Sequence, residues 1–152
     1  MKKILALLLA VLMIFSLTAC STLVGLVNDN RDNNSNHNNT GTQKNPALVA
    51  YLEKGGDAIL SSMESSFATS SGMTCTSSIE VVGDGFEIYI NINEMDDVPA
   101  ETKETMQDLY DDMDATWDLA LTSMQAEIPE LEYVKVYVCE KDGDVMATIT
   151  MD

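Results

Sequence analysis

Hydrophobic and polar residues alternate along four segments in the second half of the chain, and this period of two predicts four β-strands. The segments run from Thr74 to Val82, Phe86 to Asn93, Leu131 to Glu140 and Asp144 to Met151. Gly83-Asp84-Gly85 and Lys141-Asp142-Gly143 separate the members of each pair and are typical of hairpin turns. One side of each strand is apolar and the other polar, so we expect a sheet with one buried and one solvated face.

The parity of each strand assigns its side chains to these two faces. The buried face is predicted to hold Ile79, Val81, Phe86, Ile88, Ile90, Ile92, Val134, Val136, Val138, Val145, Ala147, Ile149 and Met151. The solvated face is predicted to hold Tyr89, Tyr133 and Tyr137, near Lys135, Glu87 and Met146. Aromatic residues on an uncovered sheet can form a recognition surface, but tyrosine also suits half-buried strands for packing reasons alone. The three tyrosines are therefore a tentative ligand surface.

A helix is predicted ahead of the first pair of strands. Asn45-Pro46 is typical of a helix start, with Asn as the cap and Pro in the first turn. Apolar residues follow at helical spacing, and Gly72 marks the end. Gly55-Gly56 interrupts the run and Asp57 could cap a new start, so we expect a kinked helix or two short ones.

A second helix is predicted ahead of the second pair of strands. It opens at Asp96-Asp97-Val98-Pro99, continues to about Glu127 and is stopped by Ile128-Pro129. Such a helix of about 30 residues would be about 45 Å long. Its apolar stripe consists of Met106, Leu109, Tyr110, Met113, Trp117, Ala120, Leu121, Met124 and Ile128. Core packing is the favoured role of its methionines, and an adaptable binding groove is the alternative.

The order of elements is therefore α-β-β-α-β-β, in two similar halves. This order predicts one α+β domain over residues 46–152, with a four-stranded antiparallel sheet and the helices packed on one face.

The N-terminus is typical of an export signal. Lys2 and Lys3 precede an apolar stretch from Ile4 to Leu17, which is shorter than the roughly 20 residues that cross a bilayer as a helix. The stretch ends in Leu17-Thr18-Ala19-Cys20, which resembles the lipobox of bacterial lipoproteins. The resemblance implies removal of residues 1–19 and lipidation of Cys20 by a diacylglycerol group with fatty acids such as palmitate. An ordinary signal peptide with an unrelated cysteine is the alternative.

A lipid on Cys20 would anchor the chain to the outer, extracytoplasmic face of the cell membrane. Residues 20–45 are then predicted to be a flexible tether, because residues 28–45 hold eight Asn and show no hydrophobic period. About 25 such residues have a mean reach of roughly 25–30 Å. The chain's one histidine, His37, lies here and is interpreted as solvated rather than as a metal ligand.

The chain is strongly acidic. Eight Lys and Arg oppose 25 Asp and Glu, which gives a formal net charge of −17. This balance excludes a nucleic-acid binder that works through phosphate contacts, and it disfavours charge-based attachment to anionic lipids. Oxygen-rich clusters can attract calcium. The acids of the second helix, Glu101, Glu104, Asp108, Asp111, Asp112, Asp114 and Asp118, are nevertheless interpreted as a solvated face, because a helix spreads them around its circumference.

The predicted domain lacks the residues of several common active sites. It has no histidine, which excludes Ser-His-Asp and Cys-His nucleophiles and His-based zinc sites. It also has no glycine-rich phosphate motif, so we expect no cofactor. Strand parity places Cys75 and Cys139 on opposite faces, which favours two separate thiols over a disulfide, although a β-bulge would reverse one facing.

The lipobox, the Asn-rich tether and the α-β-β-α-β-β order together resemble small bacterial lipoproteins with a C-terminal domain of unknown function. The resemblance depends on Gly85-Phe86-Glu87-Ile88-Tyr89-Ile90, Ile128-Pro129, Val134-Lys135-Val136-Tyr137-Val138 and Asp142-Gly143. It implies no activity. We therefore expect a lipid-anchored surface protein whose domain has a binding or structural role and is not an enzyme, with an envelope protein or peptide as partner. A hydrolase that uses an Asp/Glu pair and a weak divalent-cation binder are the alternatives, and the oligomeric state stays open.

Overall fold

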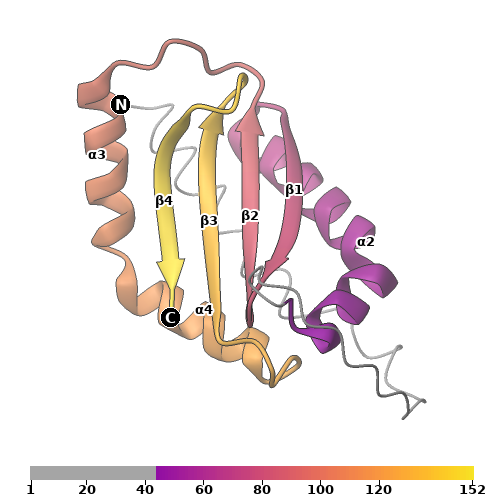
Figure 1. Cartoon of the computed structure of the whole chain (residues 1–152). Coiled ribbons are helices and arrows are strands. Elements are labelled where there is room, and N and C mark those ends of the chain that lie inside the picture. The colour runs from indigo at the N-terminus through magenta and orange to yellow at the C-terminus, as the bar shows by residue number, and fades with distance from the viewer. Residues whose placement is uncertain (1–43) are drawn as a thin grey trace.

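A computed structural model describes residues 44–152 as one sheet and three helices (Figure 1). The elements in chain order are α2 (Pro46–Ser71), β1 (Cys75–Val82), β2 (Gly85–Ile92), α3 (Ala100–Asp111), α4 (Asp114–Gln125), β3 (Tyr133–Glu140) and β4 (Val145–Met151). The predicted leader, the lipidation site Cys20 and the tether with His37 lie outside the described residues. Within residues 44–152, no helix combines the length and the apolar character needed to cross a membrane.

The four strands form a mixed sheet in the order β1-β2-β3-β4. The α+β class and both predicted hairpins are confirmed, since β1 pairs with β2 and β3 with β4 in antiparallel fashion. The prediction of a purely antiparallel sheet is wrong, because the central strands β2 and β3 run parallel. Residues 93–132, which contain α3 and α4, return the chain from one end of the sheet to the other. Strands that are joined by such a crossover run parallel.

The first helix, α2, is continuous over 26 residues. Its predicted ends are confirmed, because the Asn45 side chain accepts a hydrogen bond from the Ala47 N–H and Gly72 closes the helix with a φ of 70°. Of the two expectations at Gly55-Gly56, a division into two short helices is wrong, because α2 continues through both glycines. Each glycine costs only about 1 kcal/mol in a helix. Buried side chains before and after the pair, Leu48 and Met63 among them, hold the helix against the sheet.

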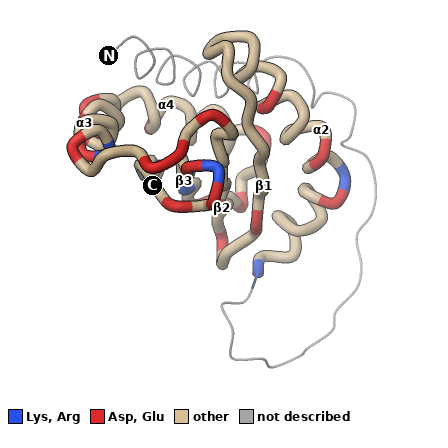
Figure 2. The backbone as a smooth tube through the Cα atoms, turned by 90° about the horizontal axis from the view of Figure 1, so that it is seen from above, with Lys and Arg blue, Asp and Glu red and all other residues tan. Residues whose placement is uncertain are grey.

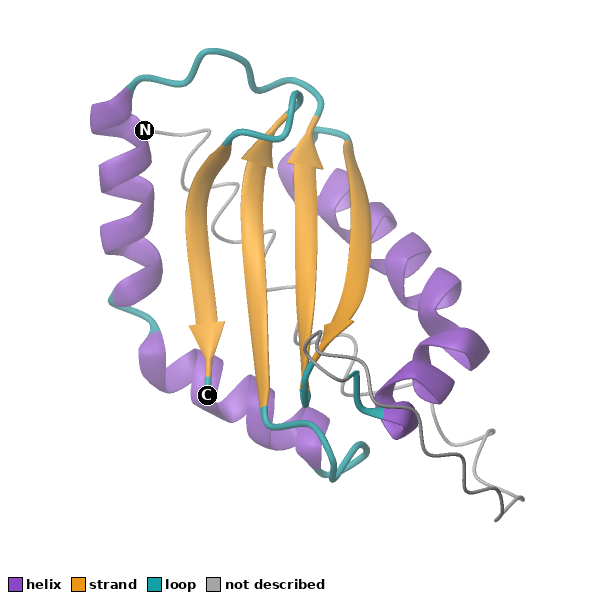
Figure 3. Cartoon of the chain, viewed as in Figure 1, coloured by secondary structure: helices purple, strands orange, loops and turns teal. Residues whose placement is uncertain are grey.

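The predicted long second helix is two helices, α3 and α4, separated by Asp112 and Met113 (Figure 3). The charges of this region account for the break. Asp111 and Asp112 lie at the negative end of the α3 dipole, where acids are unfavourable, whereas Asp114 lies in the first turn of α4, where an acid is favourable. The indole Nε1–H of Trp117 also donates to the Tyr110 carbonyl oxygen at 2.9 Å and so satisfies a carbonyl beside the break.

All three helices contribute side chains to a core on one face of the sheet, as the sequence predicted. The assignment to the core is wrong for Val145, which is 46% exposed, and Met146, predicted on the solvated face, is only 3% exposed. The pairing of β3 with β4 shifts register between Val138 and Cys139, and such a bulge reverses the facing of the residues beside it. The buried members of the second apolar stripe are Met106, Tyr110, Trp117, Leu121 and Ile128.

Candidate functional site

The face of the sheet turned away from the helices is the candidate functional surface, and we call it the open face (Figure 1). Its side chains are exposed or half-buried, in contrast to the buried residues that alternate with them. They belong to Thr76, Ser78, Glu80, Glu87, Tyr89, Asn91, Tyr133, Lys135, Tyr137, Thr148 and Thr150. Strand register arranges them in rows, of which the central one reads Ser78, Tyr89, Tyr137 and Thr148. The open face is therefore a polar surface with aromatic side chains at its centre.

Tyr89 and Tyr137 form a stacked pair on the two central strands. They are direct partners in the register of β2 and β3, and their ring centroids lie 4.7 Å apart at an interplanar angle of 16°. The Tyr89 hydroxyl donates a hydrogen bond to Glu87 Oε2 at 3.1 Å. Desolvation raises the pKa of Tyr89, and the bond to Glu87 adds to this effect. The pair is a preformed aromatic surface with its hydroxyl groups protonated at neutral pH.

Tyr133 lies beside this pair, two residues before Lys135 on β3. Its ring covers Gly85, where an added Cβ would lie 2.5 Å from ring atoms. Its hydroxyl donates to the Val82 carbonyl oxygen at 2.7 Å. The Lys135 ammonium lies 5.6 Å from the centre of the same ring, within the range of a cation–π contact. The structure thus places all three predicted tyrosines on the open face, with Tyr133 fixed against the backbone.

The charges of the open face are unbalanced. Glu80 and Glu87 are direct partners across β1 and β2, and like charges in this arrangement repel one another. Lys135 is the register partner of Glu87 on β3. Residues 44–152 as a whole hold 23 acids and five lysines, and Figure 2 shows the acids spread over helices, strands and loops.

One residue on each edge strand of the sheet is bonded by a side chain from a helix. On β1, the Ser77 N–H donates to Glu64 Oε1 at 2.7 Å, and Glu64 belongs to α2. On β4, the side-chain amide of Gln107 from α3 bonds to both backbone groups of Thr148. Sequence reasoning did not find these contacts, because they depend on tertiary packing. At Ser77 and Thr148 these bonds occupy backbone groups that an added strand would use.

A depression of about 270 Å³ lies at the break between α3 and α4, next to β4. Its lining includes Asp111, Asp114 and residues 148–150. Asp111 accepts a hydrogen bond from Gln107 Nε2 at 2.7 Å, and both aspartates are exposed. The Tyr110 hydroxyl is buried without a hydrogen-bond partner, the one such side-chain atom among the described residues. Asp111 and Asp114 thus contribute two carboxylates to the lining of one depression.

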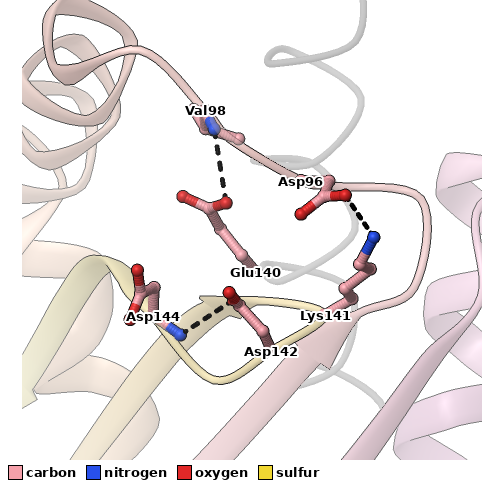
Figure 4. A network of polar contacts seen from close by, with 6 residues as sticks. All are labelled: Asp96, Val98, Glu140, Lys141, Asp142 and Asp144. Atoms are coloured by element: carbon pink, nitrogen blue, oxygen red, sulfur yellow. Dashed lines mark hydrogen bonds and ion pairs between the residues drawn. The ribbon is translucent and has the colours of Figure 1, made fainter.

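A polar network at the far end of β3 was not predicted from the sequence (Figure 4). Glu140 is 3% exposed and forms an ion pair with Lys103 of α3 at 2.5 Å. Its other carboxylate oxygen accepts a hydrogen bond from the Val98 N–H at 3.3 Å. Lys141 pairs with Asp96. These contacts fix the segment between β2 and α3 to the β3–β4 turn, so their role is structural.

The prediction of two separate thiols is confirmed, because Cys75 and Cys139 are both free. Cys75 faces the helices, whereas Cys139 shares the parity of Tyr137. Burial raises the pKa of Cys75 to about 12 and also raises the pKa of Cys139. Because the thiolate is the reactive form, neither residue is suited to nucleophilic chemistry.

Within the part of the chain that the structure describes, no three His, Cys, Asp or Glu side chains converge closely enough to hold a metal ion. Comparison of the chain with protein-family models, with curated proteins and with solved structures finds no match. The resemblance to small bacterial lipoproteins therefore stays a prediction from the sequence.

Proposed function

We propose that this protein is a lipid-anchored extracytoplasmic lipoprotein whose domain binds an envelope protein or peptide through the open face, without catalysis. The anchor follows from the lipobox-like sequence that ends at Cys20. The binding role is supported by the fold, in which all three helices contribute side chains to the core on one face of the sheet, while the side chains of the open face are exposed or half-buried.

The observation that carries this proposal is the stacked pair of Tyr89 and Tyr137 at the centre of the open face. Tyrosine is enriched at protein interfaces, because its ring offers apolar area and its hydroxyl a hydrogen bond. The two rings restrain one another before a partner arrives, which lowers the entropy cost of ordering them on binding. Glu64 and Gln107 occupy backbone groups of Ser77 and Thr148 that an added strand would use, which favours recognition by the face over strand addition.

Site-specific photocrosslinking in intact cells tests the binding role. A photoreactive residue is placed at Ser78 or Thr148, which flank the tyrosine pair in the central row, and a matched one at Ser62, which is exposed on α2. We expect a reproducible crosslinked envelope protein from the two open-face positions and none from Ser62. The product should disappear when Tyr89→Ser and Tyr137→Ser are combined. Equal products from all three positions would refute the proposal.

Mass spectrometry of the protein extracted from membranes tests the anchor. We expect the mature chain to begin at Cys20 with a diacylglyceryl mass on its thiol, and the Cys20→Ser variant to leave the membrane fraction. An intact leader or an unmodified Cys20 would refute the anchor.

The depression with Asp111 and Asp114 supports a second candidate function, hydrolysis of an envelope glycan by a carboxylate pair. A glycosidase general acid typically lies in an apolar pocket, whereas both of these residues are exposed. The measurement is the release of reducing ends from purified cell-wall glycan. Release that is lost in Asp111→Asn or Asp114→Asn would establish the hydrolase, and we expect no release from the unmodified protein.

A further inference from the structure

We propose that the partner presents a basic segment to the open face, with a lysine or arginine side chain placed against Glu80, Glu87 and the ring of Tyr89. This inference rests on the proposed function and names the chemistry of its partner. It follows from three features of the described residues. These are two carboxylates that form no ion pair, a neighbouring aromatic ring and the negative charge of the domain.

The carboxylates of Glu80 and Glu87 form no ion pair within residues 44–152. They lie directly opposite one another on β1 and β2. The ion pairs within residues 44–152 are Lys103 with Glu140 and Lys141 with Asp96, so neither glutamate has one. Lys135 is the register partner of Glu87, but its ammonium lies 5.6 Å from the centre of the Tyr133 ring and forms no ion pair with the glutamate. A cation from outside would relieve the repulsion between the two carboxylates, which the free domain has to tolerate.

The ring of Tyr89 adds a second attraction for the same cation. Tyr89 donates its hydroxyl hydrogen to Glu87, so ring and carboxylate lie next to one another. One side of the ring is stacked on Tyr137. A guanidinium or ammonium group gains electrostatic energy over a tyrosine face, and more when it contacts a carboxylate at the same time. This combination favours a basic side chain over an apolar one.

The charge of the whole domain selects the same class of partner. With 23 acids against five lysines, its field attracts basic segments and repels acidic proteins and anionic lipid surfaces. Such a field accelerates association with basic partners and disfavours acidic ones. The tyrosine pair and the two glutamates then supply the local contacts. The same field disfavours the surface of the membrane itself as the occupant of the open face.

Peptide titration of the mature lipidated chain, beginning at Cys20, in uncharged detergent micelles tests the inference. The probes are three fluorescent eight-residue peptides, in which Thr alternates with Lys, with Asn or with Glu, and anisotropy reports binding at low and at physiological salt. The test variant combines Glu80→Gln with Glu87→Gln. The matched control combines Glu101→Gln with Glu104→Gln, two exposed residues on α3, and changes the net charge equally.

We expect the Lys peptide to bind most tightly and the Glu peptide not to bind. The test variant should weaken binding of the Lys peptide about three- to tenfold, and the control less than twofold. Equal weakening in both variants would mean attraction by net charge alone and would overturn the inference. Equal or tighter binding of the Asn peptide would overturn it as well, and so would failure of the Lys peptide to bind. The crosslinking experiment decides the proposed function separately, since it does not depend on the charge of the partner.

Discussion

The side-chain amide of Gln107 forms two hydrogen bonds with the backbone of Thr148. Its Nε2 donates to the Thr148 carbonyl oxygen at 2.9 Å, and its Oε1 accepts from the Thr148 N–H at 2.8 Å. The side chain thereby pairs with β4 as a neighbouring strand would. Glu64 satisfies the Ser77 N–H on the opposite edge in a similar way. Natural sheets protect their edges against pairing with other chains, and here one helix residue does so on each side.

Gln107→Ala should therefore weaken the β4 edge. The loss of its two hydrogen bonds to Thr148, together with the one to the exposed Asp111, should lower the free energy of unfolding by about 1–2 kcal/mol. Amide exchange at Thr148 should accelerate as its N–H loses the partner. Urea unfolding and exchange measured by NMR check both effects. Thr105→Ala on the same helix is the control, because its hydroxyl bonds only to the preceding turn of α3. A Gln107→Ala variant as stable as this control would contradict the assigned role.

The ion pair of Glu140 with Lys103 predicts a pH dependence of stability. The hydrogen bond from Lys103 holds the pKa of the Glu140 carboxyl below its ordinary value of 4.5. The folded chain therefore binds a proton at Glu140 more weakly than the unfolded chain does. The stabilisation that the ion pair gives to the folded state is complete above about pH 4.5 and is lost as the pH falls through the lowered pKa. Glu140→Gln should be less stable than the unmodified protein at pH 7, and the difference should shrink in acid.

Urea midpoints measured across the acid range test this sign. Glu130→Gln, at an exposed position between α4 and β3, is the matched control and should show no comparable loss. A Glu140→Gln deficit that stays constant from pH 7 down to acid would show that packing, rather than the charge, accounts for it.

The contact of Tyr133 with Gly85 predicts a coupled pair of substitutions. An added Cβ at Gly85 would lie 2.5 Å from the ring, so Gly85→Ala should displace the ring and break its hydrogen bond to Val82. We expect a loss of about 1–3 kcal/mol, the usual cost of overpacking. In a Tyr133→Ser background the same substitution should cost less. A double-mutant cycle in urea measures the coupling, and equal costs in both backgrounds would contradict the contact.

The burial of the two cysteines predicts slow thiol chemistry. With the pKa of Cys75 raised to about 12, a small fraction is thiolate at pH 8, and Cys139 is 1% exposed. In a Cys20→Ser variant, Ellman's reagent should react slowly with the folded protein and count two thiols in denaturant. Prior reduction should leave the count unchanged. A count that rises after reduction would reveal a disulfide.

Local signals were sufficient to predict most of the elements but not their arrangement. The hairpins, the Asn45 cap and the Gly72 stop depend on neighbours in sequence, and they were correctly predicted. The parallel pairing of β2 with β3 joins strands on either side of residues 93–132, and no local pattern specifies it. The break at Asp112 had a signal in its run of acids, but it also needs the Trp117–Tyr110 hydrogen bond.

The same division holds for the candidate site. Strand parity correctly placed Tyr89, Tyr133 and Tyr137 on one face. The stacking of Tyr89 on Tyr137 follows from the parallel register and could not be predicted from an antiparallel sheet. Glu80 and Glu87 lie opposite one another because of the register of a single hairpin, so this arrangement could be predicted from the sequence. The bonds of Glu64 and Gln107 to the edge strands depend on helix docking, which strand periodicity does not encode.

The parallel central pair also affects how the chain folds. Each hairpin closes through a short turn, whereas β2 and β3 meet only after residues 93–132 have been brought into place. Closing the longer loop costs more entropy and slows the step that depends on it. We expect the two hairpins to form early and to join late. In that interval the inner sides of β2 and β3 are unpaired, which is when a newly synthesised chain is most exposed to aggregation.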